Sequence, residues 1–334
     1  MKLFITGGAG FMGSNFIRFM LEKYPQYEIL NFDKLTYAGN LENLRDIEDN
    51  PRYHFIQGDI ADENAVNTAV AQYKPEVIIN YAAETHVDRS IMAPKDFLIT
   101  DVIGTYALLE AVRAHQVPKF IQISTDEVYG GNQHKSTEET RFDPSSPYSA
   151  SKAGGDLMVQ AYWKTYRTPV MRTHSCNFFG PFQYPEKIIP LFVTNLLEGK
   201  KVPLYKGGEH NVREFIYTED HCRAIDHLLH YGELGEVYNI SSGDEIKNIE
   251  VTKKILHTLN ASEEMIEWVA DRPGHDQRYS LDSSKIRELG WEPQWSFDEA
   301  LLETIRWYQA HEDWWRPLKN GQFLEYYQKQ YKKE

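Results

Sequence analysis

The fold is decided by the stretch Lys2-Leu3-Phe4-Ile5-Thr6-Gly7-Gly8-Ala9-Gly10-Phe11-Met12-Gly13 at the start of the chain. Its first five residues predict a β-strand, and residues 12–23 have the spacing of an amphipathic helix. Gly7, Gly10 and Gly13 have the spacing of a modified dinucleotide fingerprint, in which glycines permit a tight turn and let the backbone approach a pyrophosphate. The N-terminus of the following helix supplies N–H donors for phosphates. The stretch therefore predicts a dinucleotide site.

Short apolar runs continue to alternate with helical patterns through the first half of the chain. Strands are expected at 2–6, 28–32, 53–57, 76–81, 119–124 and 169–172, and helices at 12–23, 102–115 and 149–165. This alternation predicts an α/β fold of the Rossmann type, with a doubly wound parallel sheet covered by helices on both faces. We expect later segments, about 215–245 and including the run 236–240, to return to this sheet.

The composition and the strand pattern of the sequence change after about residue 175. Aromatic residues, prolines and glycines become dense, and the strand patterns become short and scattered. We therefore predict a cofactor-binding Rossmann domain over 1–175 and a smaller C-terminal α/β domain, mainly 176–334, that binds the substrate. The stretch 297–333 has a helical pattern, and its residues Trp307, Trp314 and Trp315 are expected to pack rather than to contact a ligand.

Composition narrows the class of protein. The chain has 334 residues, 41% of them hydrophobic, and a net charge of -13, which argues against a nucleic-acid or anionic-membrane surface. With only Cys176 and Cys222, neither a disulfide framework nor a cysteine metal site is indicated, and no His or carboxylate cluster has metal-ligand spacing. Met1 leads directly into a strand pattern and no apolar run reaches about 20 residues, so we expect a cytoplasmic protein without a signal peptide or membrane span.

Further polar residues follow the predicted strands. Asp33 ends the second strand, and its carboxylate would accept hydrogen bonds from a ribose and repel a 2′-phosphate, which favours NAD over NADP. The adjacent Lys34 could soften that preference. Asp59-Ile60 follows the third strand and would flank the adenine, although Asp59 could equally be a helix cap or turn residue. Tyr81-Ala82-Ala83 ends the fourth strand with small side chains that let a cofactor lie close to the backbone.

Tyr148 and Lys152 are candidates for redox chemistry. They are four residues apart, so on a helix their side chains share a face. A nearby ammonium favours the phenolate and is expected to lower the pKa of Tyr148, which makes it a base. Lys152 could also hold the nicotinamide ribose. The spacing is common by chance, and it gains weight from the glycine-rich turn and from Ser124-Thr125 upstream.

The adjacent carboxylates of Asp126 and Glu127 directly follow the fifth predicted strand. Just past a strand end, both side chains can converge on one pocket. A solvated loop or a helix cap is the simpler interpretation. The chemical interpretation is a divided task, in which one carboxyl group stays protonated and donates to a leaving group while the other accepts a carbon-bound proton.

Longer runs then carry a resemblance that covers nearly the whole chain. They are 6–11, 33–41, 82–90, 124–130, 148–152, 184–187 and 271–275, and they resemble the extended short-chain dehydrogenases/reductases (the NAD-dependent epimerase/dehydratase family), and within them the dTDP-glucose 4,6-dehydratases. The Asp-Glu pair after Thr125 separates the dehydratases of this family from its epimerases.

The resemblance implies a lyase that converts dTDP-glucose to dTDP-4-keto-6-deoxyglucose for deoxysugar biosynthesis. Tyr148 would take the 4-hydroxyl proton while NAD accepts the C4 hydride, and Thr125 would hydrogen-bond the 4-oxygen. Glu127 would then remove the C5 proton while Asp126 protonates the departing 6-hydroxyl, and the hydride would return to C6. NAD would be tightly bound and regenerated in each turnover.

The resemblance also assigns binding residues. Those expected at the cofactor are Gly7, Gly10, Phe11, Met12, Gly13, Asp33, Lys34, Leu35, Thr36, Asp59, Ile60, Tyr81, Ala82, Ala83, Thr85, Thr100, Tyr148 and Lys152. Those expected at the nucleotide-sugar are Thr85, His86, Thr125, Asn177, Lys187, Ile188, Pro203, Leu204, Tyr205, Arg213, Asn248, Asp271, Arg272 and His275. Cations such as Lys187 and Arg213 are suited to a pyrophosphate on an acidic protein. His86 and His275 could instead be ordinary loop residues.

The sequence departs from the family pattern at a few positions. Phe178 stands where the family has a cofactor-contacting Asn, Thr85 replaces a Ser, and Asp101 replaces an Asn near the cleft. These changes leave open a 4,6-dehydratase for UDP-glucose or UDP-N-acetylglucosamine, and less readily a 4-epimerase. A non-catalytic nucleotide-sensing protein on the same fold is disfavoured by the presence of Tyr148 and Lys152. The resemblance also suggests a homodimer built through the helices at 102–115 and 149–165.

Overall fold

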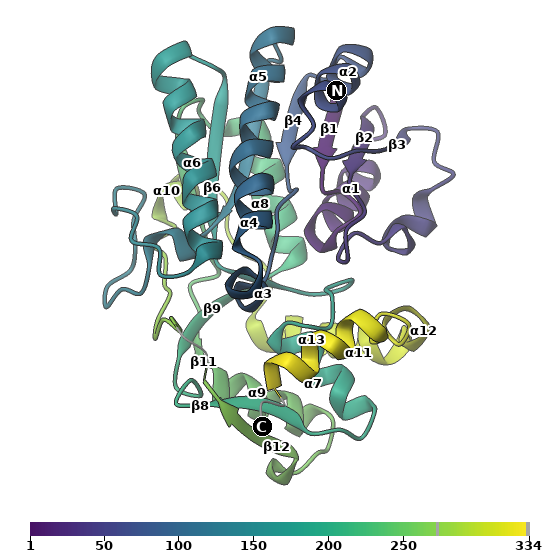
Figure 1. The fold of residues 1–334 in the computed structure, drawn as a ribbon, viewed down its shortest axis with the longest axis vertical. Helices are drawn as coiled ribbons and strands as arrows, with labels where there is room; N and C mark the ends of the chain where they lie inside the picture. Colours follow the sequence, from purple (N-terminus) through teal and green to yellow (C-terminus); the bar gives the residue numbers. More distant parts are fainter. Residues whose placement is uncertain (272–273, 332–334) are drawn as a thin grey trace.

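The larger part of the molecule is one parallel sheet. The computed structural model describes residues 1–271 and 274–331. Seven strands lie in the order β10-β6-β5-β4-β1-β2-β3, and every neighbouring pair is parallel (Figure 1). Their bounds are β1 Lys2–Thr6, β2 Glu28–Asp33, β3 Tyr53–Gln57, β4 Val77–Asn80, β5 Lys119–Thr125, β6 Val170–Ser175 and β10 Val237–Ile240. The predicted α/β Rossmann-type fold is confirmed, and the run 236–240 supplies an edge strand of the sheet.

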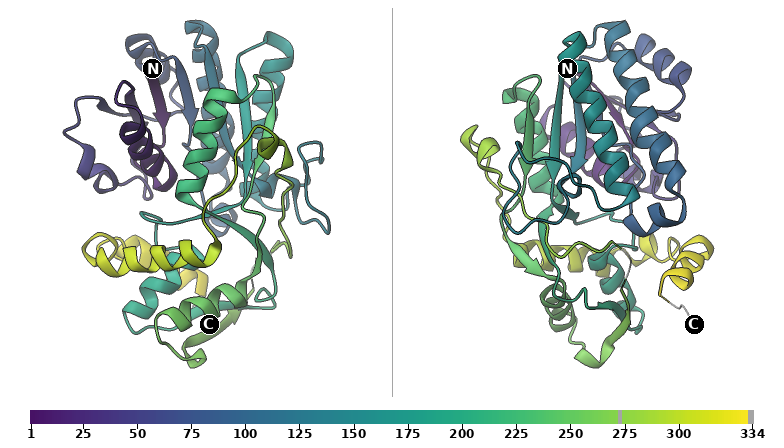
Figure 2. Two further views of the ribbon diagram at one scale, coloured as in Figure 1. Left: turned by 180° about the vertical axis from the view of Figure 1, so that it is seen from behind. Right: turned by 60° about the vertical axis from the view of Figure 1, so that its left-hand side comes forward.

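Helices cover both faces of this sheet (Figures 1 and 2). On one face, α2 (Glu63–Tyr73), α5 (Thr105–His115) and α6 (Pro147–Tyr166) pack side by side, and on the other α1 (Phe11–Lys23) packs against α8 (Thr218–Tyr231). Successive strand side chains point to opposite faces, so the strands are apolar on both sides. In β1, for example, Phe4 belongs to the core under α2 and α5, whereas Ile5 belongs to the core under α1 and α8.

The segment before α5 differs from the prediction. The helix expected from residue 102 begins as a regular α-helix only at Thr105, and a π-helix, η2 (Leu98–Gly104), precedes it. The short helices α3 (Val87–Met92) and α4 (Pro94–Phe97) lead into this π-helix. A π-helix places one extra residue in each turn and frequently marks a functional site.

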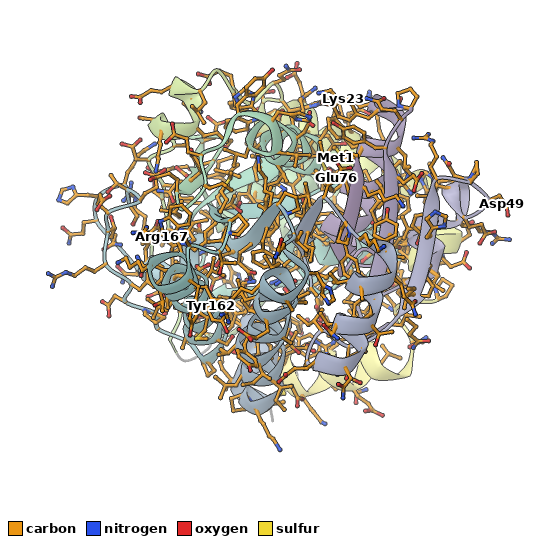
Figure 3. All side chains as sticks on the ribbon, turned by 90° about the horizontal axis from the view of Figure 1, so that it is seen from above. Met1, Lys23, Asp49, Glu76, Tyr162 and Arg167 are labelled. Atoms are coloured by element: carbon orange, nitrogen blue, oxygen red, sulfur yellow. The ribbon has the colours of Figure 1, made fainter. Side chains whose placement is uncertain are left out.

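Polar contacts join neighbouring elements at the surface. Seen from above in Figure 3, Met1 lies near Glu76, and its amino group is 3.8 Å from the Glu76 carboxylate. Lys23 at the end of α1 pairs with Asp226 of α8 at 2.6 Å. The exposed Met1–Glu76 contact contributes little, and apolar burial is the main stabilising contribution.

The C-terminal part packs around a second core. Its strands form two small sheets, β11-β9-β7 and β12-β8, and its last helices cross beneath the main sheet (Figure 2). The elements outside the main sheet are η1 Leu41–Ile47, η3 Asp126–Tyr129, β7 Asn177–Phe179, α7 Ile188–Leu197, β8 Val202–Lys206, β9 Val212–Tyr217, β11 Glu245–Lys247, α9 Asn248–Thr258, η4 Glu263–Met265, β12 Ile266–Ala270, α10 Ser284–Glu288, α11 Phe297–Ala310, α12 Glu312–Trp315 and α13 Gly321–Tyr331.

The C-terminal tryptophans pack, as predicted. Trp315 is fully buried in the second core, and Trp307 and Trp314 lie against that core. The domain boundary near residue 175 stays a prediction, and α8 and β10, which follow it in the chain, lie with the main sheet. None of the helices within 1–271 and 274–331 combines the length and apolar character needed to cross a membrane.

Candidate functional site

A deep cleft lies where the strands of the main sheet end. It has a volume of about 410 Å³, and residues at the carboxyl ends of β1, β2, β4, β5 and β6 line it together with residues of the C-terminal part. In open α/β sheets, ligands bind outside these strand ends where the strand order reverses, which here is between β1 and β4.

The cleft brings together most of the residues singled out in the sequence. All the residues expected at the cofactor line it except Leu35. Among those expected at the nucleotide-sugar, Asp271 does not line it, and Arg272 lies outside the described residues. Among the five catalytic candidates, Asp126 alone is not part of the lining. The structure thus shows which of these residues line the cleft, and their roles in binding and catalysis stay predictions.

The glycine-rich turn is closely packed against the neighbouring backbone. A Cβ atom on Gly13 would lie 2.3 Å from the Gly7 carbonyl oxygen, and one on Gly7 would lie 2.6 Å from the Ala82 nitrogen. Gly7 also has a φ of +65°, which L side chains rarely adopt. The turn therefore leaves the N-terminus of α1 open toward the cleft, as a diphosphate requires.

Asp33 has a double task at the end of β2. Its two carboxylate oxygens accept the backbone N–H groups of Ala9 at 2.9 Å and Leu35 at 2.8 Å, so it holds the glycine-rich turn in place. Burial raises the pKa of this carboxyl group, and the two N–H groups oppose the shift. Each carboxylate oxygen has a second lone pair that remains available to a ribose hydroxyl in the cleft.

Lys34 and Asp59 are paired with each other. The Lys34 ammonium lies 2.7 Å from the Asp59 carboxylate, and the other oxygen of Asp59 accepts the Ala61 N–H in a turn. The N-cap of α2 is Asp62 and not Asp59. The cap interpretation of Asp59 is therefore wrong, the turn interpretation is confirmed, and the charge of Lys34 is balanced at the rim of the cleft.

The two adjacent carboxyl groups occupy different environments. After β5 the chain turns into the 3₁₀-helix η3, whose N-cap Thr125 accepts the Glu127 N–H at 3.2 Å and donates to Asp126 Oδ1 at 3.1 Å. Glu127 lines the cleft, whereas Asp126 is 2% exposed and its Oδ2 has no hydrogen bond to a described residue. Burial, reinforced by the charge of Glu127, raises the pKa of Asp126 well above its usual range. Glu127 thus reaches the cleft as expected, whereas Asp126 is not part of the lining and is buried beside Thr125, which is.

Tyr148 and Lys152 lie in the first turns of α6. Ser146 caps this helix through a reciprocal bond with Ser149, and Lys152 donates to the carbonyl oxygen of Ile123 at 3.0 Å. Burial, together with the charges of Glu127 and Asp101, raises the pKa of Tyr148 well above its usual range. The expected lowering by Lys152 is therefore not found, because burial and two carboxylates outweigh one ammonium.

Cations and amides line the opposite side of the cleft. Lys187 is the N-cap of α7, and Arg213 on β9 donates to the Asp276 carbonyl oxygen at 2.8 Å while its guanidinium stacks 4.4 Å from the Tyr279 ring. Asn248 donates to the Gly208 carbonyl oxygen at 3.0 Å. These contacts fix the direction of groups suited to a phosphate or a nucleoside.

The two histidines, both outside regular helices and strands, differ in burial and in their partners. His86 is buried at the start of α3, and its Nε2 lies 3.2 Å from the hydroxyl of Tyr326 on the C-terminal helix α13. His275 lines the cleft, and Asp271, which does not, holds its Nδ1 at 2.7 Å. Asp271 therefore orients the His275 ring.

Some lining residues were not recognised in the sequence. Glu186 accepts hydrogen bonds from the Tyr37 hydroxyl at 2.8 Å and the Arg89 guanidinium at 2.9 Å. It could have been identified from its place in the run 184–187, which resembles the family. Tyr279 and Tyr331 also line the cleft, and no local pattern identifies them. Phe178, which the sequence singled out as a departure from the family pattern, lines it as well, and its ring packs 4.5 Å from the His221 ring.

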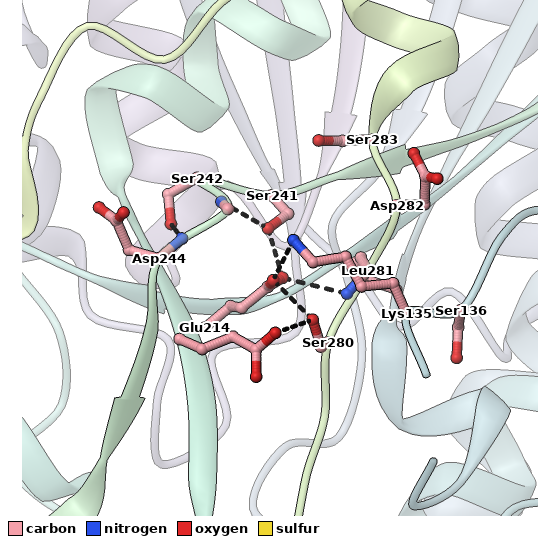
Figure 4. A network of polar contacts seen from close by, with 12 residues as sticks. Lys135, Ser136, Glu214, Ser241, Ser242, Asp244, Ser280, Leu281, Asp282 and Ser283 are labelled. Atoms are coloured by element: carbon pink, nitrogen blue, oxygen red, sulfur yellow. Dashed lines mark hydrogen bonds and ion pairs between the residues drawn. The ribbon is translucent and has the colours of Figure 1, made fainter. Parts of the chain in front are cut away.

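Glu214, between Arg213 and Phe215 on β9, was also missed. Its fully buried carboxylate accepts the Ser280 hydroxyl at 2.9 Å and the Leu281 N–H at 3.1 Å, and it also contacts the Ser241 hydroxyl (Figure 4). These partners come from distant segments that meet behind the cleft wall. The network therefore holds β9, and with it Arg213, in place.

Within the part of the chain that the structure describes, no group of three or more His, Cys, Asp or Glu side chains is arranged to hold a metal ion.

A Rossmann-type sheet with a glycine-rich turn and a Tyr-Lys pair in one cleft defines a short-chain dehydrogenase/reductase type of protein. Comparison with known proteins refines this class. The sequence profile of the family described as GDP-mannose 4,6 dehydratase matches residues 4–304. The chain belongs to this family.

Individual relatives are similar over nearly their whole length. The low-salt glycan biosynthesis protein Agl12 of Haloferax volcanii is 47% identical over 94% of this chain and 100% of its own. A crystal structure of dTDP-glucose 4,6-dehydratase from Bacillus anthracis in complex with NAD is 48% identical, with a TM-score of 0.89 over 96% of this chain and 100% of that one. The structure of DesIV, a dTDP-glucose 4,6-dehydratase from Streptomyces venezuelae with NAD and TYD bound, is 47% identical, with a TM-score of 0.93 and the same coverage.

Proposed function

We propose that this protein is an NAD-dependent dTDP-glucose 4,6-dehydratase, which forms dTDP-4-keto-6-deoxyglucose. The observation that carries the proposal is the unequal pair at the end of β5, where a buried carboxyl group with a raised pKa is next to a carboxyl group that lines the cleft. An elimination of water needs one acid and one base in addition to the base that removes the 4-hydroxyl proton, whereas an epimerisation at C4 needs only the latter. Solved relatives that bind NAD and carry this activity support the proposal.

The residues around the first part of the cleft fit NAD. Gly7 and Gly13 have no Cβ that would stand between the backbone and a diphosphate. The buried Asp33 carboxylate accepts ribose hydroxyls and repels a 2′-phosphate. When bound, NAD supplies a carbon that accepts hydride from C4 and later returns it to C6, and a positively charged ring that favours the Tyr148 phenolate.

The first task of the protein is to remove the 4-hydroxyl proton. Tyr148 takes this proton as C4 loses hydride, and Lys152, one turn further along α6, holds the ribose and favours the phenolate. Thr125 at the end of β5 lines the cleft and orients the 4-oxygen through its hydroxyl. The product of this step is a 4-keto sugar.

The second task is the elimination. The ketone acidifies the C5 proton, Glu127 accepts that proton, and Asp126 donates its own proton to the departing 6-hydroxyl, which leaves as water. Burial keeps Asp126 protonated. Its carboxyl group is bonded to Thr125 and must turn toward the cleft to reach the 6-hydroxyl, whereas Glu127 already lines the cleft. Hydride then returns to C6 and Glu127 returns its proton to C5. Tyr148 then carries the proton of the 4-hydroxyl and Asp126 has lost one, so Tyr148 must release a proton and Asp126 must regain one before the next turnover.

The nucleotide end of the substrate is held by the C-terminal part. Lys187 and Arg213 neutralise the pyrophosphate, and Asn248 and His275 contact neighbouring groups of the nucleotide. Because the net charge of the chain is -13, these local cations carry the attraction for an anionic substrate.

Turnover of dTDP-glucose, UDP-glucose and UDP-N-acetylglucosamine by the purified protein, without added NAD, tests this function. We expect dTDP-glucose to lose one water and to be the best of the three substrates by kcat/KM. If a UDP-sugar is preferred and loses water, the proposed reaction holds and the proposed substrate is wrong. Unchanged sugar mass with inversion at C4 would replace dehydration with epimerisation.

We also infer that the protein forms a homodimer through η2 and α6. Leu98 and Ile103 on η2 and Leu157 on α6 are about half exposed, at 53%, 48% and 52%, and η2 packs against α6. A second copy would cover these side chains by a symmetric helix pairing. Leu157→Glu is expected to give monomers in sedimentation experiments, whereas Leu324→Glu on α13 should leave the dimer intact, and an unchanged mass for Leu157→Glu would contradict the interface.

A further inference from the structure

Asp101 is a buried carboxyl group linked to the proposed base through Ser151, whose hydroxyl contacts both Asp101 Oδ2 at 2.6 Å and the Tyr148 carbonyl oxygen at 2.8 Å, and no step of the reaction above uses it. It lies in the π-helix η2 and is 3% exposed. Its backbone is pressed against α6, because a Cβ atom on Gly155 would lie 2.5 Å from the Asp101 carbonyl oxygen. Its position relative to Tyr148 and Lys152 is therefore fixed by packing.

The charge of Asp101 acts on both members of the Tyr148–Lys152 pair. Burial raises the pKa of Asp101 to about 6, and the Lys152 ammonium and the Ser151 hydroxyl oppose the shift. In turn, Asp101 is one of the groups that raise the pKa of Tyr148, after burial and Glu127. The other facing groups come from α6, the segment after β4, α4 and η3, and they are Asp156, Glu84, Asp96 next to Glu84, Asp126 and Glu127.

We propose that Asp101 is a positioning residue whose carboxylate charge controls when Tyr148 can act as a base. The anion compensates the Lys152 ammonium and disfavours a second negative charge on the phenol oxygen, so the proton stays longer on Tyr148 as the pH rises. The inference rests on the proposed function only in that Tyr148 is the base, because the coupling between Asp101 and Tyr148 exists without a substrate. An amide at position 101 accepts the same Ser151 bond and carries no charge.

The coupling has two pH regimes. Below about pH 6 the Asp101 carboxyl group is protonated, and the protein behaves like a variant with a neutral side chain at that position. Above that pH the carboxylate is charged, and deprotonation of Tyr148 requires a higher pH than it would without the charge. The charge therefore delays activity on the alkaline side and has no effect on the acid side.

The test compares Asp101→Asn with the unmodified protein, both with bound NAD. The first readout is the pH dependence of kcat/KM. The second is the ultraviolet absorbance of the Tyr148 phenolate, taken as the difference from the Tyr148→Phe counterpart of each protein. For Asp101→Asn we expect the ionisation midpoint of Tyr148 to fall by roughly half to one pH unit. Its kcat/KM should be about 3- to 10-fold higher than that of the unmodified protein between pH 6 and the plateau, and equal to it below pH 6.

Ser151→Ala separates charge from position, because it removes the hydrogen bond and keeps the carboxylate. It should raise the pH at which Asp101 begins to affect Tyr148, since the Ser151 hydroxyl lowers the pKa of Asp101. It should leave the Tyr148 midpoint on the alkaline side unchanged. If Asp101→Asn does not fold, the higher onset pH in Ser151→Ala is the test instead, and an unchanged onset pH overturns the proposal.

An unchanged or higher Tyr148 midpoint in folded Asp101→Asn overturns the proposal as well. If no nucleotide-sugar is turned over, the proposed function fails, and the absorbance titration still decides whether Asp101 controls the phenol.

Discussion

Replacement of the buried acid by its amide, Asp126→Asn, is the most informative single perturbation of the proposed elimination. Asp126 is 2% exposed and its pKa is raised by burial and by Glu127, so the amide replaces a neutral group of nearly the same shape. Loss of a general acid typically costs 10²- to 10⁴-fold in rate, which corresponds to roughly 3 to 5 kcal/mol of transition-state stabilisation. The first hydride transfer does not need this acid, so it should continue.

Asp126→Asn should lose activity without losing stability. A carboxyl group whose pKa is raised on folding binds its proton more tightly in the folded state, so it destabilises the fold increasingly as the pH rises above its unfolded pKa. Asp126→Asn should therefore have a free energy of unfolding at neutral pH equal to or above that of the unmodified protein. Loss of activity would then not be loss of structure.

The assay is rapid mixing of the NAD-loaded variant with dTDP-glucose. Absorbance of reduced nicotinamide should appear at nearly the unmodified rate and then persist, and the quenched sugar should be the 4-keto compound that has kept its 6-hydroxyl. The matched control is Asp49→Asn, which makes the same Asp-to-Asn replacement at an exposed site away from the cleft. Full turnover by Asp126→Asn, or loss of the first hydride transfer in a folded variant, would refute the assigned role.

Three further outcomes follow from the geometry. Gly13→Ala should release NAD during purification, because its Cβ would lie 2.3 Å from the Gly7 carbonyl oxygen, while Gly321→Ala, which has nothing within 4 Å, should retain it; equal nucleotide content in the two proteins contradicts the fit. Arg213→Gln should raise KM by about tenfold or more with a smaller change in kcat, as expected for lost charge-assisted bonds to a pyrophosphate, and a reversed pattern in steady-state kinetics argues against that contact. Asp101→Asn should gain up to about 3 kcal/mol in free energy of unfolding between about pH 4 and pH 7, since the pKa of Asp101 is raised from 3.8 to about 6 and each unit is about 1.4 kcal/mol; urea titrations that show no gain with pH would contradict the shift.

The parts of the fold set by local patterns could be predicted from the sequence. The alternation of apolar strands and amphipathic helices predicts the sheet, and the glycine spacing predicts the turn between β1 and α1. The π-helix η2 was not predicted, because its pattern of side chains is that of an ordinary helix entering α5. It packs against α6, and this tertiary contact is not visible in the local pattern.

The site was predictable where its residues follow a strand or share a helix face, as Asp33, Glu127 and Tyr148 do. The different environments of Asp126 and Glu127 could not be read from two neighbouring letters, because η3 decides which side chain turns inward. Burial likewise reversed the expected direction for the pKa of Tyr148. Glu214 was missed because its partners come together only in the folded chain.

The central claim is that one hydride leaves C4 and returns to C6 within a single turnover while Asp126 and Glu127 remove water. It is tested most directly with dTDP-glucose that carries deuterium at C4, incubated with the protein without added NAD and examined by mass spectrometry and NMR. We predict a product that has lost one water and carries the deuterium in its C6 methyl group. Deuterium that stays at C4 of a sugar of unchanged mass, or that is lost from a dehydrated product, would contradict the account.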